Sequence, residues 1–209
     1  MAFCNRVAQL MLLNVLFVVS CIPIVTLGAA VTALQGMCHR LLEDRDGNLA
    51  SNYFRLFRQN FRQATLLWLV LLASGLLIAE YLYLAFFSRM TVTVMGVPMA
   101  LLMMPVAIFL AIAWLMILVW AFVLQGQFEN TLRRTLANAF MVAVLHLPRT
   151  VVNLAVLAVC VIAPVMLPAT LFFWVLLGFA FGAYLTTALN QSVICQLRKN
   201  AGDAPYREG

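Results

Sequence analysis

The chain has 209 residues, of which 65% are apolar and only 10% are charged. A typical soluble domain is about half apolar and about a quarter charged, and a soluble fold of this size cannot bury so much apolar surface. The net charge of +6 does not indicate nucleic-acid binding, because the basic residues stand at the ends of apolar runs rather than in a dense patch. We therefore predict an all-α fold: a polytopic transmembrane helical bundle of about five spans in the lipid bilayer, one domain over residues 1–209, with amphipathic interfacial helices in the cytoplasmic loops.

The first apolar run covers residues 7–37 and is longer than the roughly 20 residues that one span needs. Its middle holds Cys21-Ile-Pro-Ile-Val-Thr-Leu-Gly28, where proline removes a backbone donor and glycine loosens the chain, so we expect a break. Two interpretations stay open: a single span kinked at Pro23, which we favour, or two half-helices that form a re-entrant hairpin. A cleaved signal peptide is a third and weaker interpretation, because the run continues past Gly28 to Met37.

A polar turn follows, and then an amphipathic segment over about residues 51–63. Three phenylalanines recur there at helical spacing, and an arginine follows directly behind each of them. This pattern is typical of a helix that lies in the headgroup layer. The segment either anchors the loop to anionic lipid, which we favour, or provides a docking surface for a partner. The interfacial or docking residues are Phe54, Arg55, Phe57, Arg58, Phe61 and Arg62.

Four further apolar runs predict spans over residues 64–87, 97–124, 149–165 and 169–195. Pro105 can bend the second of these. Between the second and third lies another amphipathic segment, about residues 127–143, whose polar side carries Arg133 and Arg134 as further interfacial or docking residues. We expect the tail over residues 198–209 to be flexible.

The loop charges predict the orientation. Eleven basic residues fall on one side of the predicted membrane, and only Arg6 and Arg89 fall on the other. Since loops rich in lysine and arginine stay in the cytoplasm, we expect a multi-pass protein of the inner (plasma) membrane with a cytoplasmic C-terminus. The N-terminus faces out if the first run crosses once and in if that run is a hairpin. The eleven are Arg40, Arg45, Arg55, Arg58, Arg62, Arg133, Arg134, Arg149, Arg198, Lys199 and Arg207.

Three segments, residues 21–34, 53–64 and 138–149, resemble in this order segments of the YesL family of bacterial integral membrane proteins. The first carries the run Pro-x-x-Thr-x-Gly-x-x-x-x-Ala-Leu, the second the aromatic and basic pattern, and the third Asn138-Ala-Phe-Met-Val-Ala-Val-Leu-His-Leu-Pro-Arg149. The resemblance spans about residues 7–195. That family is a domain of unknown function whose members often lie beside genes for sugar-uptake transporters and glycan breakdown, so the resemblance implies a role near carbohydrate import and supplies no catalytic residues.

Four residues are candidates for ligand binding. Pro23, Thr26 and Gly28 form the helix break, and transporters use such breaks to coordinate substrate, although a packing kink is the favoured explanation. Glu80 is the only acid within an apolar span, which makes it a functional candidate by default. Its position near the outer end of its span, beside Tyr81 and Tyr83, also suits an ordinary interfacial carboxylate.

Two rows of small and polar residues at four-residue spacing are candidates for helix packing. Small residues at this spacing let helices approach closely, and the hydroxyl and amide groups can bond across the contact. We expect these rows to pair the first span with the last one, or to pair two protomers. The rows are Gly28, Thr32 and Gly36, and Gly178, Gly182, Thr186 and Asn190.

No pattern indicates an enzyme or a metal site. Met95, Met99, Met103 and Met104 offer soft ligands for copper, but methionine is also an ordinary filler of apolar gaps. The two histidines, His39 and His146, have no nearby nucleophile or acid in a catalytic pattern. We expect no catalytic residue, no metal and no cofactor.

Three hypotheses remain. The first is a non-enzymatic accessory or regulatory component associated with carbohydrate uptake, which contacts a transporter component through the segments around Arg55 and Arg133. The second is a small oligomeric transporter that uses the break between Pro23 and Gly28 together with Glu80. The third is a membrane assembly or lipid-organising protein. The expected partners are the bilayer, a carbohydrate transporter component or a second copy of the chain, and no nucleic acid.

Overall fold

The computed structural model describes residues 2–45, 47–87, 93–94, 97–127 and 131–201. Most of them are helical; two short strands over residues 93–98 form an antiparallel hairpin, and the other described residues form short turns and connections. The elements are α1 (Ala2–Ser20), η1 (Ile24–Thr26), α2 (Leu27–Leu42), α3 (Leu49–Phe87), β1 (Thr93–Val94), β2 (Val97–Pro98), α4 (Met99–Gln125), α5 (Leu132–Leu145), α6 (Leu147–Met166), η2 (Pro168–Thr170), α7 (Leu171–Phe173), the π-helical η3 (Trp174–Gly178) and α8 (Phe179–Ala201).

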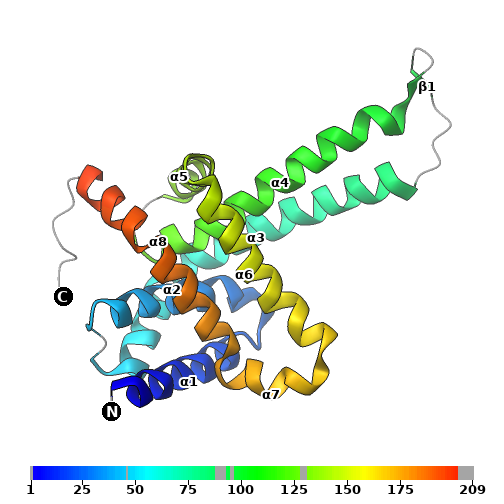
Figure 1. The fold of residues 1–209 in the computed structure, drawn as a ribbon. Coiled ribbons are helices and arrows are strands. Elements are labelled where there is room, and N and C mark those ends of the chain that lie inside the picture. The colour runs from blue at the N-terminus through cyan, green and yellow to red at the C-terminus, as the bar shows by residue number, and fades with distance from the viewer. Residues whose placement is uncertain (1, 46, 88–92, 95–96, 128–130, 202–209) are drawn as a thin grey trace.

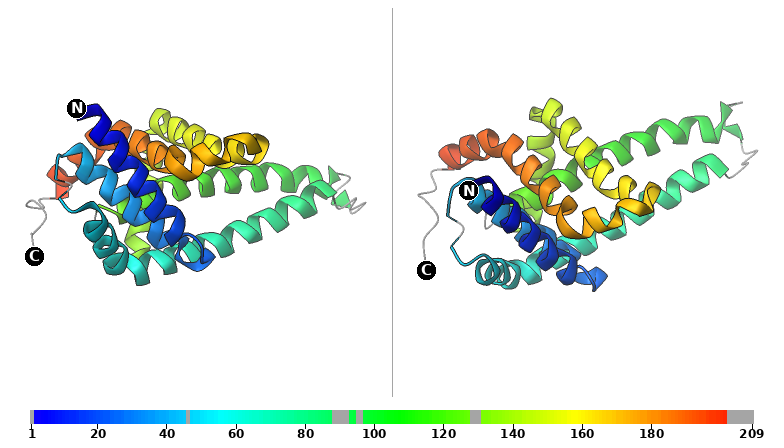
Figure 2. Two further views of the ribbon diagram at one scale, coloured as in Figure 1. Left: turned by 90° about the horizontal axis from the view of Figure 1, so that it is seen from below. Right: turned by 60° about the horizontal axis from the view of Figure 1, so that its bottom comes forward.

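The first apolar run folds into two helices that reverse direction at Pro23. Arg6 near the start of α1 forms an ion pair with Asp44 just beyond α2, so the two outer ends of this hairpin lie together. Figures 1 and 2 show α1 and α2 side by side, joined by the short turn that contains η1. The favoured prediction of a single kinked helix over residues 7–37 is therefore wrong, and the hairpin alternative describes the structure.

The reversal has a local chemical cause. Pro23 adopts an extended conformation, with φ −79° and ψ 120°, and it cannot continue the hydrogen-bonding pattern of α1. The Thr26 hydroxyl lies 2.7 Å from the carbonyl oxygens of both Ser20 and Pro23, and it can donate to either. The turn thus satisfies part of the backbone that the end of α1 leaves open.

Helix α3 is a single helix of 39 residues. At 1.5 Å per residue it is about 58 Å long, whereas the hydrocarbon core of a bilayer is about 30 Å thick. The amphipathic segment over residues 51–63 and the predicted span over residues 64–87 are therefore one continuous element. Its first half packs antiparallel to α2, because Gly36 faces Leu56 and Gly28 faces Ala64.

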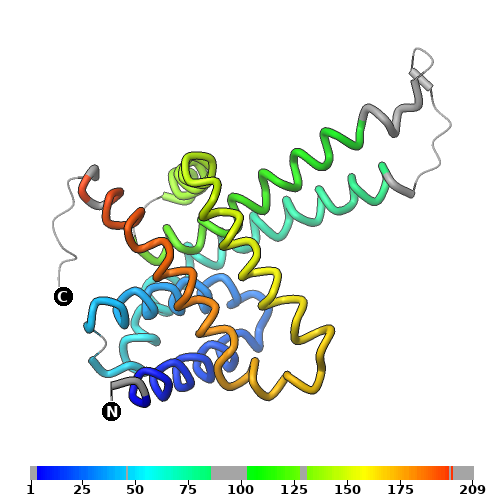
Figure 3. The backbone as a smooth tube through the Cα atoms, in the orientation of Figure 1, coloured from blue at the N-terminus to red at the C-terminus, as the bar shows by residue number. Residues whose placement is uncertain are grey.

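Beyond Trp68, α3 continues past the turn of the first hairpin in company with α4. Figures 1 and 3 show these two helices projecting from the rest of the molecule, with β1 near their far end. We call residues 69–87 and 99–118 the α3–α4 arm. The indole nitrogen of Trp114 donates to the Leu71 carbonyl oxygen at 3.1 Å and to Ser74 Oγ at 3.0 Å, which joins the two helices near the base of the arm.

The rest of the protein centres on four helices. Helix α2 packs against α4 and α8, and α6 also packs against α4 and α8. The four therefore close a ring, which we call the four-helix ring. Helix α1 lies against α8 and η3, and α5 lies against α4. Two apolar clusters fill the interior, one among α1, α2, α3 and α8 and one among α3, α4, α5 and α8.

Four segments are long and apolar enough to cross a membrane: Leu49–Ala85, Met103–Gln125, Leu147–Met166 and Pro168–Leu197. The predicted class, a polytopic transmembrane helical bundle, is thus confirmed. These segments correspond to the four predicted spans after residue 63. The predicted amphipathic segment over residues 127–143 corresponds to α5. The first predicted span corresponds to the α1–α2 hairpin, in which Cys4–Ser20 is a shorter apolar helix.

The hairpin also changes the side on which Arg6 lies. Its ion pair with Asp44 places it at the end of the molecule where α2 ends and α3 begins. Figure 2 shows the start of α1 and the end of α8 near this end, and the α3–α4 arm extending toward the opposite end. Arg6 therefore joins the basic loops instead of opposing them, which corrects its assignment from the sequence. Arg89, the other residue assigned to the sparse side, lies outside the described residues.

Candidate functional site

The break around Pro23 is closely packed at its Gly28 end, whereas residues 22–25 of the turn are exposed. Gly28 is buried, and a Cβ atom added to it would lie 2.4 Å from the Ala64 carbonyl oxygen and 2.5 Å from Trp68 Cβ. The indole nitrogen of Trp68 donates to the Ile24 carbonyl oxygen at 3.1 Å. With Thr26 bonded inside the turn, the polar groups described here are used by the protein itself. This arrangement favours the packing explanation over a ligand site.

Glu80 lies far from that turn. It is exposed on the outer part of α3, twelve residues beyond the Trp68 that contacts Ile24. Twelve residues of α-helix span about 18 Å. The structure therefore does not bring Glu80 together with Pro23, Thr26 and Gly28, and the ligand site predicted from these four residues does not assemble within one chain.

The first row of small residues packs as expected but against other helices. Gly28 contacts α3, and a Cβ on Gly126 at the end of α4 would lie 3.0 Å from the Thr32 carbonyl oxygen. Gly36 likewise faces Leu56 of α3 and the Gly126 carbonyl oxygen. The row thus holds α2 against α3 and α4, while α2 packs against the last span through other residues, such as Gln35.

The second row of small and polar residues, on the last span, contacts several different elements. A Cβ on Gly182 would lie 2.6 Å from Cys160 Sγ of α6, while Gly178 lies under the ring of Trp174. Thr186 meets the side chain of Gln35 on α2, with 3.4 Å between the amide nitrogen and the hydroxyl oxygen. The last span therefore uses this row to contact α6 and α2.

Inside the four-helix ring, Gln35 is the first of several buried or half-buried amides. Its side-chain oxygen accepts a hydrogen bond of 2.6 Å from the Thr187 hydroxyl. Both Thr186 and Thr187 are also within hydrogen-bond distance of the Ala183 carbonyl oxygen. These contacts join α2 to α8 with polar groups whose partners are all supplied by the protein.

Asn14 performs a comparable role at the π-helical segment. Its amide nitrogen donates to the carbonyl oxygens of Trp174 at 2.9 Å and Val175 at 2.6 Å, and its oxygen accepts from the Ala180 amide at 2.7 Å. A π-helical turn interrupts the regular i→i−4 pattern of the backbone. Asn14, which is fully buried, supplies the missing partners and joins α1 to the start of α8.

Asn153 of α6 and Asn190 of α8 differ from the other amides. Their relative exposures are 1% and 0%, and none of their side-chain nitrogen and oxygen atoms has a hydrogen-bond partner among the described residues. A buried polar group without a partner costs about 1–3 kcal/mol. We call these two residues the asparagine pair.

The contacts between α6 and α8 place the two asparagines at about the same level. Arg149 donates to Ser192 Oγ at 2.7 Å, and Cys160 faces Gly182, so the two helices run antiparallel. Counting inward from either contact puts Asn153 opposite residues 188–189, within two residues of Asn190. Thr150, one turn before Asn153, accepts a hydrogen bond of 2.9 Å from the Trp120 indole, which brings α4 to the same place.

A second polar junction lies at the end of α4. The Gln125 side-chain oxygen accepts hydrogen bonds from Gln63 Nε2 at 3.4 Å and from the Thr135 hydroxyl at 3.2 Å. Gln125 and Thr135 are buried. This junction fixes the start of α5 against α3 and α4, and it thereby sets the position of Arg133 and Arg134.

The predicted interfacial residues are accessible. Phe54 and Phe61 are exposed on α3, and the rings of Tyr53, Phe57 and Phe61 follow one another, with centroids 6.4 Å and 5.5 Å apart. The arginines of both amphipathic segments, Arg55, Arg58, Arg62, Arg133 and Arg134, are also exposed. Their exposure leaves them accessible, and the interfacial or docking role stays a prediction.

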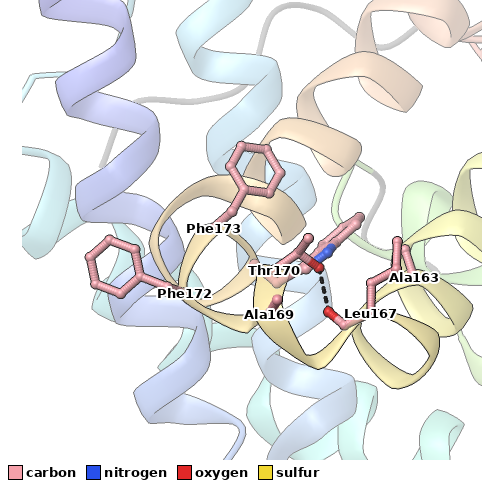
Figure 4. Close-up of a pocket in the computed structure, with 7 residues that line it drawn as sticks. Ala163, Leu167, Ala169, Thr170, Phe172 and Phe173 are labelled. Carbon is pink, nitrogen blue, oxygen red and sulfur yellow. Dashed lines mark hydrogen bonds between the residues drawn. The ribbon is translucent and has the colours of Figure 1, made fainter.

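One pocket lies at the turn between α6 and α7, and it shares only Trp174 with the contacts described above. Figure 4 shows Phe172, Phe173 and Thr170 around it, with the Thr170 hydroxyl donating to the Leu167 carbonyl oxygen at 2.7 Å. Its volume is about 460 Å³, and no ionisable side chain lines it. An apolar pocket of this kind suits an acyl chain better than a polar ligand. The lining residues are Ala163, Leu167, Ala169, Thr170, Phe172, Phe173 and Trp174.

The sequence analysis did not single out Asn14, Gln35 or Asn153. Each is a polar residue within an apolar run, which is the same signal that drew attention to Glu80. Treating every polar residue within an apolar run as a candidate would have found all three. It would not have separated Asn14 and Gln35, whose partners lie in distant helices, from Asn153, which has none among the described residues.

Comparison with known proteins gives one finding. The model of a family described as "Protein of unknown function, DUF624" matches residues 10–80. The match runs from α1 into the outer half of α3, and it includes the break and the aromatic and basic segment. Residues 138–149 lie outside it. Neither a curated protein nor a solved structure matches the chain.

Proposed function

We propose that the chain is a non-enzymatic, membrane-embedded accessory or regulatory component of an uptake system, and that the α3–α4 arm is the surface through which it joins its partner. The arm carries this proposal. Its two helices project beyond the rest of the fold, and large apolar side chains cover its outside. Leu77 is 72% exposed and Phe109 is 68% exposed.

A pair of helices has no interior through which a solute could pass. A stand-alone transporter needs a bundle that encloses its substrate site near the middle of the membrane. In this chain the one acid of the arm, Glu80, is exposed on the outer part of α3, and it lies about 18 Å along that helix from Trp68, which contacts the turn at Pro23. This separation is why the accessory role is preferred over the transporter alternative.

Carbohydrate uptake is the finer part of the proposal. Its support is the ordered resemblance of residues 21–34, 53–64 and 138–149 to a family whose members often lie beside sugar-uptake genes. The matched family model spans the first two of these segments. We further propose that the protein lies in the inner (plasma) membrane with its basic loops and C-terminus in the cytoplasm, as the distribution of lysine and arginine favours.

Site-specific photo-crosslinking in native membranes tests the docking surface. A photoreactive amino acid at Leu77 or Phe109 should give adducts with a component of a carbohydrate transporter. The matched control is Val151 on α6, which is 62% exposed and lies outside the arm. Val151 should give adducts with lipid alone.

Two results would contradict the proposal. Equal transporter adducts from Val151 would show that the arm is not the docking surface. Adducts only between two copies of this chain would replace the accessory role with homo-oligomerisation.

A further inference from the structure

The pocket at the turn between α6 and α7 has a local cause in the backbone. Pro164 lies in the last turn of α6 and Pro168 begins η2, and each lacks the amide hydrogen that a continuous helix would use. Leu167 between them leaves the helical conformation, with φ −123° and ψ 74°. The chain therefore turns sharply and leaves a recess beside the turn. We call this recess, shown in Figure 4, the turn pocket.

Small and large side chains together shape the turn pocket. Ala163 of α6 and Ala169 of η2 leave room, while Phe172 and Phe173 of α7 and the buried Trp174 of η3 supply three aromatic rings. Ligand pockets in proteins usually have volumes of about 300–1,000 Å³ and a mainly apolar and aromatic lining. With its volume of about 460 Å³, the turn pocket has room for a ligand.

The protein itself holds Trp174 in position. A Cβ atom on Gly178, one turn later, would overlap the Trp174 ring, so the ring lies directly against the glycine. The centroid of the Phe179 ring is 5.7 Å from that of Trp174. The Trp174 carbonyl oxygen also accepts a hydrogen bond of 2.9 Å from Asn14 on α1. The fold therefore fixes this wall of the turn pocket without an occupant.

The turn pocket lies in an uncharged hairpin formed by α6 and α8. Residues 150–197 contain no charged residue, and Arg149 and Arg198 flank them. Met166, the last residue of α6, is 17 residues beyond Arg149, which is about 25 Å along the helix. The hydrocarbon core of a bilayer is about 30 Å thick. With Arg149 at the level of the headgroups, the turn and its pocket therefore lie within the hydrocarbon.

The lining and the rim of the turn pocket favour an apolar occupant. No lining residue is ionisable, and the Thr170 hydroxyl already donates to the Leu167 carbonyl oxygen at 2.7 Å. At the rim, Met166 is 69% exposed and Phe172 is 75% exposed. A charged or strongly polar ligand would lose its hydration there and find few partners, which is costly. A hydrocarbon chain loses no hydrogen bond and gains dispersion contacts with the aromatic rings.

We propose that the turn pocket is a binding site for one acyl chain of a membrane phospholipid. Within a bilayer, association is driven by close packing, because lipid tails are as apolar as the side chains that they meet. A recess with fixed aromatic walls packs around a chain on more sides than the surface of a single helix can. The site uses no residue of the α3–α4 arm, so it holds or fails independently of the proposed docking role.

Photo-labelling of the purified full-length protein in dodecyl maltoside micelles tests the site. The probe is a phosphatidylcholine that carries a diazirine in one acyl chain, and it is added at rising ratios to the detergent. Mass spectrometry should find adducts at Ala169, Phe172 and Phe173 that rise and then saturate. Phe181 on α8 is the internal control, since it is 50% exposed and lies outside the pocket lining. Adducts at Phe181 should rise in proportion to the probe without saturating.

A matched pair of variants links the labelling to the space in the pocket. Ala163→Phe fills the turn pocket, whereas Ala158→Phe is the same enlargement at an exposed position of α6 outside the lining. Neither position is buried, so both variants should keep the melting temperature of the wild type. Probe affinity at the turn should fall about tenfold or more in Ala163→Phe and match the wild type in Ala158→Phe.

Three results would overturn the proposal. The first is labelling at the turn that rises in proportion to the probe, as at Phe181. The second is saturable labelling that Ala163→Phe leaves unchanged. The third is displacement of the probe by unlabelled palmitate but not by unlabelled phosphatidylcholine, which would make the occupant a free fatty acid. The comparison of the turn with Phe181 is made in the wild type, so it decides the question even if a variant fails to fold.

Discussion

The four-helix ring and the α3–α4 arm differ in what their side chains contact. In the ring, polar side chains are buried and most of them bond to another helix, as Gln35 and Thr187 do. In the arm, two helices touch each other around Trp114, and their remaining apolar surface is left for the surroundings. Most polar groups of the ring thus find partners within the protein, whereas the apolar surface of the arm is left for lipid or another protein.

This contrast separates stability from association. A change in the ring should lower the stability of the whole protein, because each polar or small residue there joins elements far apart in the sequence. A change on the arm should act locally or on the partner. The following predictions test that division, beginning with the change that should cost most.

Gly28→Leu should lower the stability of the whole protein, because Gly28 packs α2 of the four-helix ring against α3. The new side chain has no room between the Ala64 carbonyl oxygen and Trp68 Cβ, and neither backbone nor Cβ can swing aside. Overpacking of this kind typically costs about 1–3 kcal/mol and occasionally more, and the backbone contact puts Gly28 at the upper end. Thermal unfolding in detergent measures the loss.

The control for Gly28→Leu is Ala79→Leu, the same enlargement at an exposed position on the arm. It should leave the melting temperature unchanged. A similar loss in both variants would show that the arm is packed as tightly as the ring.

Asn14→Leu removes the polar contacts that hold α1 to the π-helical segment. The carbonyl oxygens of Trp174 and Val175 and the amide of Ala180 would lose their partner. Each buried group left without a partner costs about 1–3 kcal/mol, and part of this loss is recovered by burying leucine, so we expect a net loss of about 2 kcal/mol. The melting temperature reports it.

Asn5→Leu provides the comparison for that variant, since Asn5 is exposed on the same helix. Its melting temperature should match that of the wild type. If Asn14→Leu also matches the wild type, Asn14 does not hold α1 to η3.

Trp114→Phe tests the arm. It keeps an aromatic ring between α3 and α4 but removes the N–H group that donates to Leu71 and Ser74. The loss should be about 1 kcal/mol, as for an ordinary hydrogen bond, and it should be local. Hydrogen exchange should therefore quicken in the outer half of α3 and stay unchanged in α8; faster exchange in both would show that arm and ring unfold together.

The same division explains what could be read from the sequence. The apolar runs after residue 63 predicted their spans well, because the length of an apolar run is a local property. The turn at Pro23 could not be settled in this way. A kink and a reversal share the same local pattern, and the deciding contacts, such as Arg6 with Asp44, join residues far apart in the chain.

The candidate site shows the same limit. Polar residues within apolar runs are visible in the sequence, but their partners are not. Thr186 and Asn190 were expected to pack, and Thr186 does meet α2 through Gln35. That Asn190 instead lies at about the same level as Asn153, with no partner for either among the described residues, depends on how α6 and α8 align.

Glu80→Gln should have the smallest effect, and it separates the two regions most sharply. Glu80 is exposed on the arm and far from the turn at Pro23, so its substitution should change the free energy of unfolding by no more than about 0.5 kcal/mol. Flux of sugar through the whole uptake system, measured in cells, should persist with this variant because the arm contributes contact area and not a substrate site. Complete loss of flux with an unchanged melting temperature would restore Glu80 to the transport step. The flux measured with Glu80→Gln therefore decides whether the arm takes part in transport or serves only as a contact surface.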